Sequence, residues 1–222
     1  MNQSYGRSGG GFLSSIPPIV KNLIIINALI LLATQVESFR LPMYEYLALF
    51  YPQSPFFKPH QLLTHMFMHS DFWHLFFNMY ALWIFGSPLE RTWGSKRFLL
   101  FYLVTGIGAA LFYILVQWVQ ITYFGGNLYN AMTIPMVGAS GAIFGVLLGF
   151  GMLFPNVILQ LIFPPVRLKA KYFVMIYGAL ELFLSIQQPG DSVAHVAHVG
   201  GMIFGFILIK LWKKKSMNKY WS

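Results

Sequence analysis

The sequence predicts an all-α, polytopic membrane protein, built as a bundle of six transmembrane helices with a membrane-embedded first loop. Three observations lead to this fold class. Of the 222 residues, 57% are hydrophobic and 9% are charged, whereas a soluble domain usually carries about 25% charged residues. The mean hydropathy is +0.61. Apolar segments recur along the chain, and the basic residues are sorted to one side of them.

The chain divides into a tail, a membrane domain and a second tail. Residues 1–15 are expected to be a mobile cytoplasmic tail, residues 16–213 the six-helix membrane domain, and residues 214–222 a basic cytoplasmic tail. The apolar stretch after Ser15 is too long for a signal-peptide core and lacks a small-residue cleavage site, so it is interpreted as a retained helix. The expected spans are, in order, 17–38, 72–88, 98–119, 140–154, 171–187 and 193–212.

The positions of Lys and Arg support this arrangement. With six spans and a cytoplasmic N-terminus, Arg40 and Lys58 are the only two of the 15 basic residues that face outside. This distribution follows the positive-inside rule, and one missed or added helix would scramble it. The run Lys213–Lys215 then anchors the chain at the inner face of the membrane. The net charge of +9 therefore does not indicate nucleic-acid binding.

The long first loop, residues 39–71, is rich in aromatic residues and has few charges. Amphipathic, aromatic segments of this kind are stable in the interfacial region of a bilayer. The loop is therefore expected to lie partly sunk in the outer leaflet.

A serine at the start of the fourth span is the first candidate catalytic residue. Ser140 lies within the segment PMVGASGAIFG, residues 135–145. The preceding proline and glycine disfavour a helix, so Ser140 is expected at a helix N-terminus, where free N–H groups and the helix dipole stabilise a negative oxygen. The alternative is a packing ridge of Gly141, Gly145 and Gly149 with Ser140 as its cap.

Ionisable and amide residues interrupt two other spans. His74 and Asn78 lie in the second span, and His195 and His198 lie at the start of the sixth. Even-numbered spans all start outside, so these residues share the outer side with Ser140. At a rise of about 1.5 Å per residue, Ser140 and His198 both lie several ångströms below the outer surface. They are expected to meet in a cavity that opens to the outside.

Two spacings bring more groups to this cavity. His198, Gly201 and Gly205 share one face of the sixth span, and glycine ridges on the fourth and sixth spans permit close helix packing. His74 and Asn78 are four residues apart and can aim two donors at one point, as in a side-chain oxyanion hole completed by the Ser140 N–H. The plain alternative is a pair of satisfied polar packing residues.

In this order the motifs resemble those of the rhomboid intramembrane serine proteases. They are His65-Met-Phe-Met-His69, His74-x-x-x-Asn78, Gly138-Ala-Ser140-Gly141 and His198-x-x-Gly201-x-x-x-Gly205, and they cover roughly residues 55–210. The resemblance implies a rhomboid-type six-helix bundle with a Ser–His dyad, in which Ser140 is the nucleophile and His198 the general base. It also implies an oxyanion site of His74, Asn78 and the Ser140 backbone, packed by Gly138, Gly141, Phe144, Gly201 and Gly205.

The resemblance further implies hydrolysis of single-span membrane proteins near the outer membrane boundary, through an acyl-enzyme and without a cofactor or metal. The expected partners are transmembrane substrates and the lipid bilayer, with no nucleic acid, and the oligomeric state is left open. The expected location is a bacterial inner membrane, with both termini cytoplasmic and the active site open to the outside. Three positions depart from the family pattern: His60-Gln61 replaces a Trp-Arg pair, and Phe144 replaces a tyrosine that stacks on the catalytic histidine.

Two other classes are considered on the residues alone. A metal-dependent protease or a polytopic metal-binding transporter would use the six histidines, although no His-Glu-x-x-His motif occurs and the chain has only six acidic residues. A non-proteolytic membrane chaperone would tolerate scattered polar residues. Glu181, in the outer half of the fifth span, is expected to be protonated or hydrogen-bonded, and no function is assigned to it.

Overall fold

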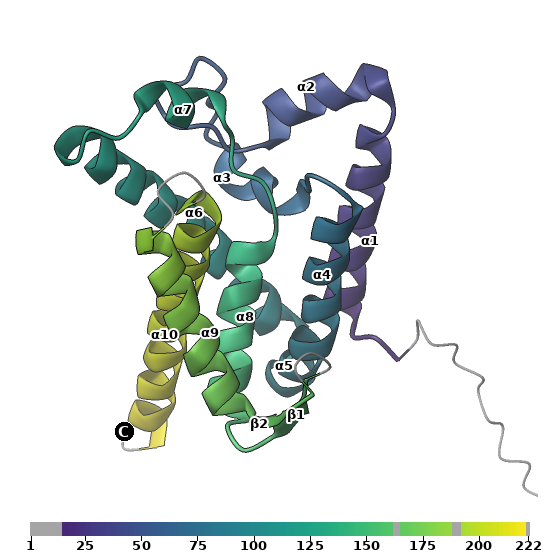
Figure 1. Cartoon of the computed structure of the whole chain (residues 1–222). Helices are drawn as coiled ribbons and strands as arrows, with labels where there is room; N and C mark the ends of the chain where they lie inside the picture. Colours follow the sequence, from purple (N-terminus) through teal and green to yellow (C-terminus); the bar gives the residue numbers. More distant parts are fainter. Residues whose placement is uncertain (1–14, 162–164, 188–191, 221–222) are drawn as a thin grey trace, which may run out of the picture.

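The computed structural model describes residues 15–161, 165–187 and 192–220, so the predicted mobile tail, residues 1–15, lies almost entirely outside the described part. Helices carry nearly all of the regular structure there, as the all-α prediction requires (Figure 1). An antiparallel pair of three-residue strands is the exception.

The first half of the chain begins with an apolar helix and a long connection. Helix α1 spans Pro18–Thr34, and a separate helix, α2, spans Glu37–Leu47. The expected first span, 17–38, is therefore wrong at its end, because the chain turns after Thr34 and starts α2. The first loop continues with α3 (Gln61–Thr64) and the 3-10 turn η2 (His65–Phe67).

The second expected span is a composite helix. It consists of α4 (Phe72–Ala81), the π-helical turn η3 (Leu82–Gly86) and α5 (Ser87–Trp93). It continues beyond residue 88, and it ends at Gly94, whose φ of +79° breaks the helical path. Helix α6 begins at once and spans Ser95–Tyr123, which extends the expected third span at both ends.

The second half of the chain contains the short helix α7 (Leu128–Thr133) and then α8 (Ser140–Leu153). Strands β1 (Ile158–Gln160) and β2 (Arg167–Lys169) follow and pair antiparallel, with Leu159 opposite Leu168. This ribbon was not expected from the sequence. Helices α9 (Ala170–Gln187) and α10 (Ser192–Tyr220) complete the chain. Because α10 reaches Tyr220, the segment predicted as a basic tail begins as a continuation of the last helix.

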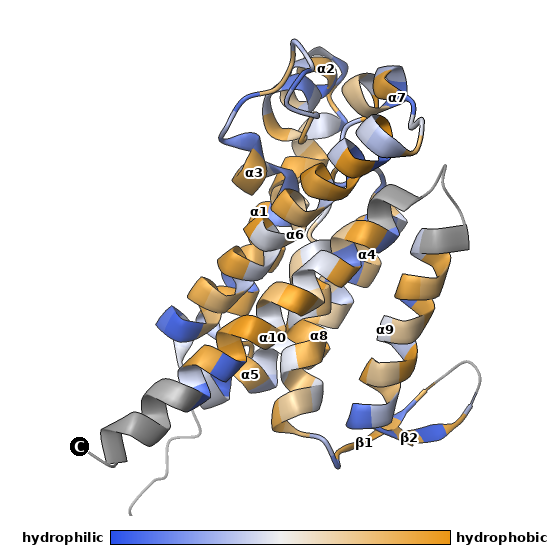
Figure 2. Ribbon diagram, turned by 90° about the vertical axis from the view of Figure 1, so that its left-hand side faces the viewer, coloured by the Kyte–Doolittle hydropathy of each residue, from blue (hydrophilic) through white to orange (hydrophobic). Residues whose placement is uncertain are grey.

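Helix α8 lies among α4, α6, α9 and α10, and both views show it surrounded by these helices (Figures 1 and 2). Its closest packing is against α10 through glycines. A Cβ added at Gly201 would overlap with the carbonyl oxygen of Gly141, and one at Gly205 would lie 3.3 Å from Cα of Gly145. Gly141 and Gly145 therefore face Gly201 and Gly205, and the backbones of α8 and α10 come into the close contact that was predicted. Gly149, the third glycine of the α8 ridge, packs instead against side chains of α5 and α6.

Hydrophobic residues run along the lengths of the central helices (Figure 2). Among the described residues, two helical segments are long and apolar enough by themselves to cross a membrane: Ser95–Tyr123 and His195–Lys213. Helices α1 and α8 are apolar but shorter. Helices thus lie where all six spans were expected, whereas the count of six membrane crossings stays a prediction.

Candidate active site

Backbone contacts from the first loop fix the segment that leads into α8. Leu49 and Met136 exchange two backbone hydrogen bonds, of 2.9 and 2.8 Å, and the N–H of Gly138 donates to the carbonyl of His65 at 2.9 Å. Gly138 has a φ of +117°, which a residue with a side chain rarely adopts. The loop and the glycine together set where the helix starts.

Ser140 is the first residue of α8, as predicted. Ala139 occupies the N-cap position and no side chain caps the helix, so the alternative in which Ser140 serves as a cap is wrong. The serine is half-buried, and no hydrogen bond of its hydroxyl to another described residue is found. Its Oγ is therefore free to react at the positive end of the helix dipole.

His198 on α10 is held by two contacts. Its ring stacks on that of Phe144 from α8, with centroids 4.0 Å apart and planes inclined by 11°. Its Nδ1 lies 2.9 Å from Oε2 of Glu181 on α9. Phe144 thus provides the stacking surface expected of it. Since Glu181 occupies Nδ1, the Nε2 atom of His198 is the one available to exchange a proton with another group.

His74 on α4 lies beside the serine. A Cβ built at Gly138 would be 2.8 Å from Cε1 and Nε2 of His74 and 3.8 Å from Oγ of Ser140. Gly138 therefore leaves the space that separates the two side chains. The buried Asn78 lies one turn further along α4 and donates from Nδ2 to the carbonyl of His74 at 2.8 Å. This bond uses one amide hydrogen and leaves the second for another acceptor.

The opposite nitrogen of His74 belongs to a short hydrogen-bonded chain at the start of α4. Oγ of Ser70 lies 3.1 Å from Nδ1 of His74 and donates to Oδ2 of Asp71 at 2.6 Å. A serine hydroxyl has one proton, so while it bonds Asp71, the ring must donate from Nδ1. In that arrangement His74 donates from Nε2 only when both ring nitrogens are protonated. When Ser70 instead turns its proton towards Nδ1, that nitrogen accepts and the neutral ring donates from Nε2.

A single cavity of about 1050 Å³ brings these groups together. Its walls come from α4, η3, α8, α9 and α10, from the segment before α8, and from β1 and η2 at its edges. The residues that line it include His74, Asn78, Gly138, Ser140, Gly141, Phe144, Glu181 and His198. The structure therefore places the predicted nucleophile, base and oxyanion donors around one space, and it places Gly201 and Gly205 at the helix crossing behind them.

The histidines of the first loop have a structural environment. His65 is buried and its Nδ1 bonds the carbonyl of Gln61 at 2.9 Å. The His69 ring lies edge-on to that of His74, with 4.9 Å between the ring centroids. Neither ring nitrogen of His69 forms a hydrogen bond of good geometry with a described residue, although the Phe67 backbone is near. Burial lowers the pKa of His65 to about 4 and that of His69 to about 3, so both rings are neutral at pH 7.

Gln61, one of the residues that depart from the family pattern, anchors the first loop. Its side chain is fully buried. Its Nε2 donates to the carbonyls of Glu45 and Phe56, each at 2.9 Å. Its Oε1 accepts from the N–H groups of Lys58 at 3.1 Å and Phe50 at 3.4 Å. One amide therefore ties together four points of the loop.

Glu181 is the site residue for which the sequence analysis assigned no function. Its Oε2 lies 2.6 Å from Nδ1 of His195 as well as 2.9 Å from that of His198. The predicted hydrogen bonding of this carboxylate is confirmed. The three side chains also form a group whose potential metal-ligating atoms all lie within 4.8 Å of one another. The sequence feature that could have indicated this contact is a carboxylate in an apolar helix, which the predicted topology brings beside two histidines.

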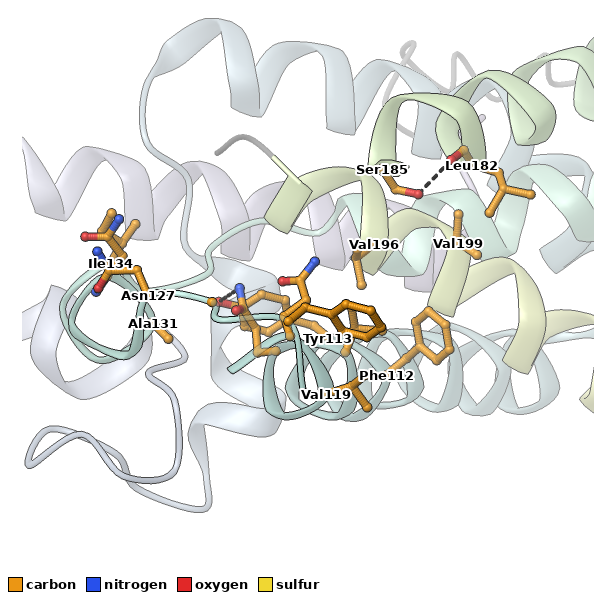
Figure 3. A pocket seen from close by; sticks show the side chains of 16 residues that line it. Phe112, Tyr113, Val119, Asn127, Ala131, Ile134, Leu182, Ser185, Val196 and Val199 are labelled. Atoms are coloured by element: carbon orange, nitrogen blue, oxygen red, sulfur yellow. Dashed lines mark hydrogen bonds between the residues drawn. The ribbon is translucent and has the colours of Figure 1, made fainter. Parts of the chain in front are cut away.

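A second cavity, of about 880 Å³, lies between α6, α7, α9 and α10 (Figure 3). Apolar side chains such as Phe112 and Val196 and the amides of Gln117 and Asn130 line it. No His, Asp or Glu is among its described lining residues. The groups suited to hydrolysis therefore belong to the first cavity.

The fold and the site define a helical protein with a serine and a histidine in one cavity. Residues 57–215 match the family model described as the Rhomboid domain. The chain belongs to the rhomboid family, and it is an integral membrane protein.

Two characterised relatives illustrate the similarity. Rhomboid protease AarA of Providencia stuartii is 32% identical over 148 residues, covering 64% of this chain and 52% of that protein. Rhomboid protein 1, mitochondrial, of Saccharomyces cerevisiae is 39% identical over 153 residues, covering 69% of this chain and 41% of that protein. The chain thus matches about half of the length of each. Neither relative's name favours the metal-transporter or chaperone alternatives.

Proposed function

We propose that this chain is an intramembrane serine protease that uses Ser140 and His198. The observation that carries the proposal is the shared cavity, in which Ser140 begins α8 and faces the same space as His198, His74 and Asn78. Family membership supports the same class of reaction.

In the proposed first step, Oγ of Ser140 attacks the carbonyl carbon of a peptide bond while its proton passes to Nε2 of His198. The carbonyl oxygen becomes negative in the tetrahedral intermediate. The backbone N–H of Ser140, the second amide hydrogen of Asn78 and the His74 ring are the donors around it. A single oxyanion donor typically contributes about a hundredfold to a thousandfold in kcat.

The intermediate collapses when His198 gives its proton to the leaving amine, and an acyl-enzyme on Ser140 remains. Water then attacks the ester while His198 accepts one of its protons. As the ester bond breaks, His198 gives that proton to Oγ of Ser140, which releases the second product as an acid and restores the enzyme. The site needs a water-filled cavity for this second step, since lipid supplies no water.

The proposed substrates are single-span membrane proteins, cut near the outer boundary of the membrane. We further propose that the six helical segments each cross the bilayer, with both termini cytoplasmic and the site open to the outside, in a bacterial inner membrane. The chain contains no cysteine, so single cysteines at Lys58 and Arg167 report this orientation. An impermeant thiol reagent added to intact cells should label the first position and not the second.

The test of the activity uses purified protein, a single-span test substrate and three variants. Ser140→Ala and His198→Ala should each reduce cleavage by about three orders of magnitude or more while the protein stays folded. His195→Ala should keep a measurable fraction, since that ring does not line the cavity with Ser140. A serine-directed fluorophosphonate should label wild type and not Ser140→Ala, and a chelator should change nothing. Activity of Ser140→Ala within tenfold of wild type would refute the proposal.

A further inference from the structure

A buried carboxylate reaches the candidate general base from a neighbouring helix. Glu181 lies on α9 and is 6% exposed. One of its two carboxylate oxygens, Oε2, makes two contacts to α10. It lies 2.6 Å from Nδ1 of His195 and 2.9 Å from Nδ1 of His198. Both are short hydrogen bonds, as expected when the acceptor is a carboxylate. The carboxylate therefore has two donors, which offset the cost of its removal from water.

The contact to Glu181 determines what His198 can do. A carboxylate accepts and does not donate, so the Nδ1 atom of His198 carries the proton of the neutral ring. The lone pair is then on Nε2, the nitrogen that a base needs for the proton of Ser140. The stack on Phe144 fixes the plane of the ring, and the bond to Glu181 fixes its rotation within that plane.

We propose that Glu181 is a positioning residue for His198, which selects the reactive tautomer and stabilises the imidazolium formed when Ser140 gives up its proton. The inference rests on the proposed protease function and extends its Ser–His pair to Ser140, His198 and Glu181. The proton from Oγ moves to Nε2, the proton on Nδ1 stays on the ring, and Glu181 remains a carboxylate throughout.

His195 has a supporting position in this arrangement. It donates to the same oxygen of Glu181 and does not line the cavity with Ser140. Its bond holds the carboxylate in the orientation that also serves His198. We therefore expect its removal to weaken the effect of Glu181 without eliminating it.

With Oε2 and the two Nδ1 atoms as ligands, the same three side chains could hold a cation only after rearrangement. Ligand atoms around a tetrahedral zinc ion, bound at about 2.0–2.1 Å, lie roughly 3.3 Å from one another. The separations of 2.6 and 2.9 Å between Oε2 and the two ring nitrogens are shorter than this. The observed geometry is thus one of hydrogen bonds.

The charges around the cavity bear on how the site responds to pH. From the first loop and α4, His65, His74 and Tyr80 line it, and from α9 and α10, Tyr177, Glu181 and His198 do so. Lys and Arg are absent from its described lining residues. Glu181 is therefore the group there that can balance a positive charge on His198.

The experiment compares Glu181→Gln with a matched substitution at another buried carboxylate. Glu90 is 2% exposed and accepts from the N–H groups of Ile19 and Val20 at the start of α1, away from the cavity. Glu181→Gln should lower kcat by at least about tenfold and change KM by no more than about twofold, because it acts on proton transfer. Glu90→Gln should lower the thermal stability and leave kcat per labelled active site unchanged.

A pH profile separates positioning from simple structural support. Without the carboxylate, protonated His198 is less stable, so the acid limb of the kcat profile should move to lower pH in Glu181→Gln. Glu181→Leu, which suits an apolar helix, should show the same shift. Rates are divided by the number of sites that react with a fluorophosphonate, so that unfolded protein does not enter the comparison.

The outcomes distinguish this inference from the function on which it rests. If wild type cleaves, Ser140→Ala does not, and both Glu181 variants keep the wild-type kcat and pH profile, the positioning role is refuted and the protease function stands. A loss of kcat that follows thermal stability equally in the Glu181 and Glu90 variants also refutes it. Wild-type protein without serine-dependent cleavage would overturn both.

Discussion

The rings of Phe144 and His198 lie nearly parallel, 4.0 Å apart, and join the two helices that carry the candidate nucleophile and base. Phe144 is one turn beyond Ser140 on α8, so the nucleophile and the surface that holds the base belong to one rigid element. Its ring has no hydroxyl, and Glu181 supplies the polar contact to His198 from another helix.

Substitution of Phe144 tests the value of this stack. Phe144→Ala should lower kcat by about three- to tenfold, because an aromatic pair of this kind contributes about 0.5–1.5 kcal/mol beyond its buried area. Phe144→Tyr keeps the ring and should stay within about threefold of wild type. The measurement is steady-state cleavage of one substrate by the three proteins. Equal rates for Phe144→Ala and wild type would show that the stack does not position His198.

Local patterns in the sequence were sufficient to predict much of this site. A proline and a glycine before an apolar run predicted that a helix begins at Ser140, and the i, i+3, i+7 spacing on α10 predicted its glycine face. Both features depend on neighbouring residues along one helix, so one-dimensional spacing carries the information. Close packing of α8 and α10 then follows from two complementary glycine faces.

Contacts between helices were harder to foresee. The bonds from Glu181 to His195 and His198 depend on how α9 and α10 are rotated and shifted against each other, which the sequence of either helix does not specify. The four bonds of Gln61 depend on the path of an irregular loop. The π-turn at Leu82–Gly86 ends at a glycine and is followed by Pro88, and these residues indicate an irregularity without specifying a π-helical path.

Among the glycines of the α8–α10 crossing, Gly201 has the least room for an added side chain. A methyl group there would overlap with the carbonyl oxygen of Gly141, and backbone cannot move aside as a side chain can. Gly201→Ala should therefore destabilise the protein by about 1–3 kcal/mol or more and separate Ser140 from His198. Unfolding in a mixed-detergent titration, followed by circular dichroism, measures the change.

Gly178→Ala on α9 is the matched control for this substitution. Its Cβ would meet the end of the Met202 side chain at 2.9 Å, and that flexible chain can shift. Gly178→Ala should lower the free energy of unfolding by less than about 1 kcal/mol. If the two variants unfolded at the same detergent fraction, the tight crossing would not be a major source of stability.

Acid should destabilise the first loop through His65, which lies outside the helices expected to span the membrane. Burial lowers the pKa of His65 from 6.5 to about 4. Between these two pKa values the unfolded chain binds more protons than the folded one. The free energy of unfolding is therefore not reduced by His65 above about pH 6.5, and it falls as the pH drops towards 4. His65 alone should cost about 2 kcal/mol between pH 7 and pH 5.

Unfolding in detergent at pH 7 and pH 5 checks this prediction. His65→Gln should be less stable at pH 7, because it loses the bond to the Gln61 carbonyl, and its stability should change less with pH. His69, whose pKa burial lowers to about 3, acts in the same direction and should keep part of the dependence. Stability that rose from pH 7 to pH 5 in wild type would contradict the sign.

The residue just before the cut in a substrate should be small. A Cβ at Gly138 would lie 2.8 Å from the His74 ring and 3.8 Å from Oγ of Ser140, so the space beside the nucleophile is narrow, and we expect the substrate residue next to the reacting carbonyl to occupy it. The segment must also unwind, because a helical backbone keeps its carbonyls bonded, and residues such as Gly, Pro or Ser near the cut make unwinding easier. Changing the residue before the cut from Ala to Phe should lower kcat/KM by at least about tenfold, as should replacing the helix-breaking residues with Leu.

Mass spectrometry of the fragments from such a substrate series gives both the cleavage rate and the cleavage site. Cuts at the cytoplasmic end of the substrate, or equal rates across the series, would contradict the geometry of the site.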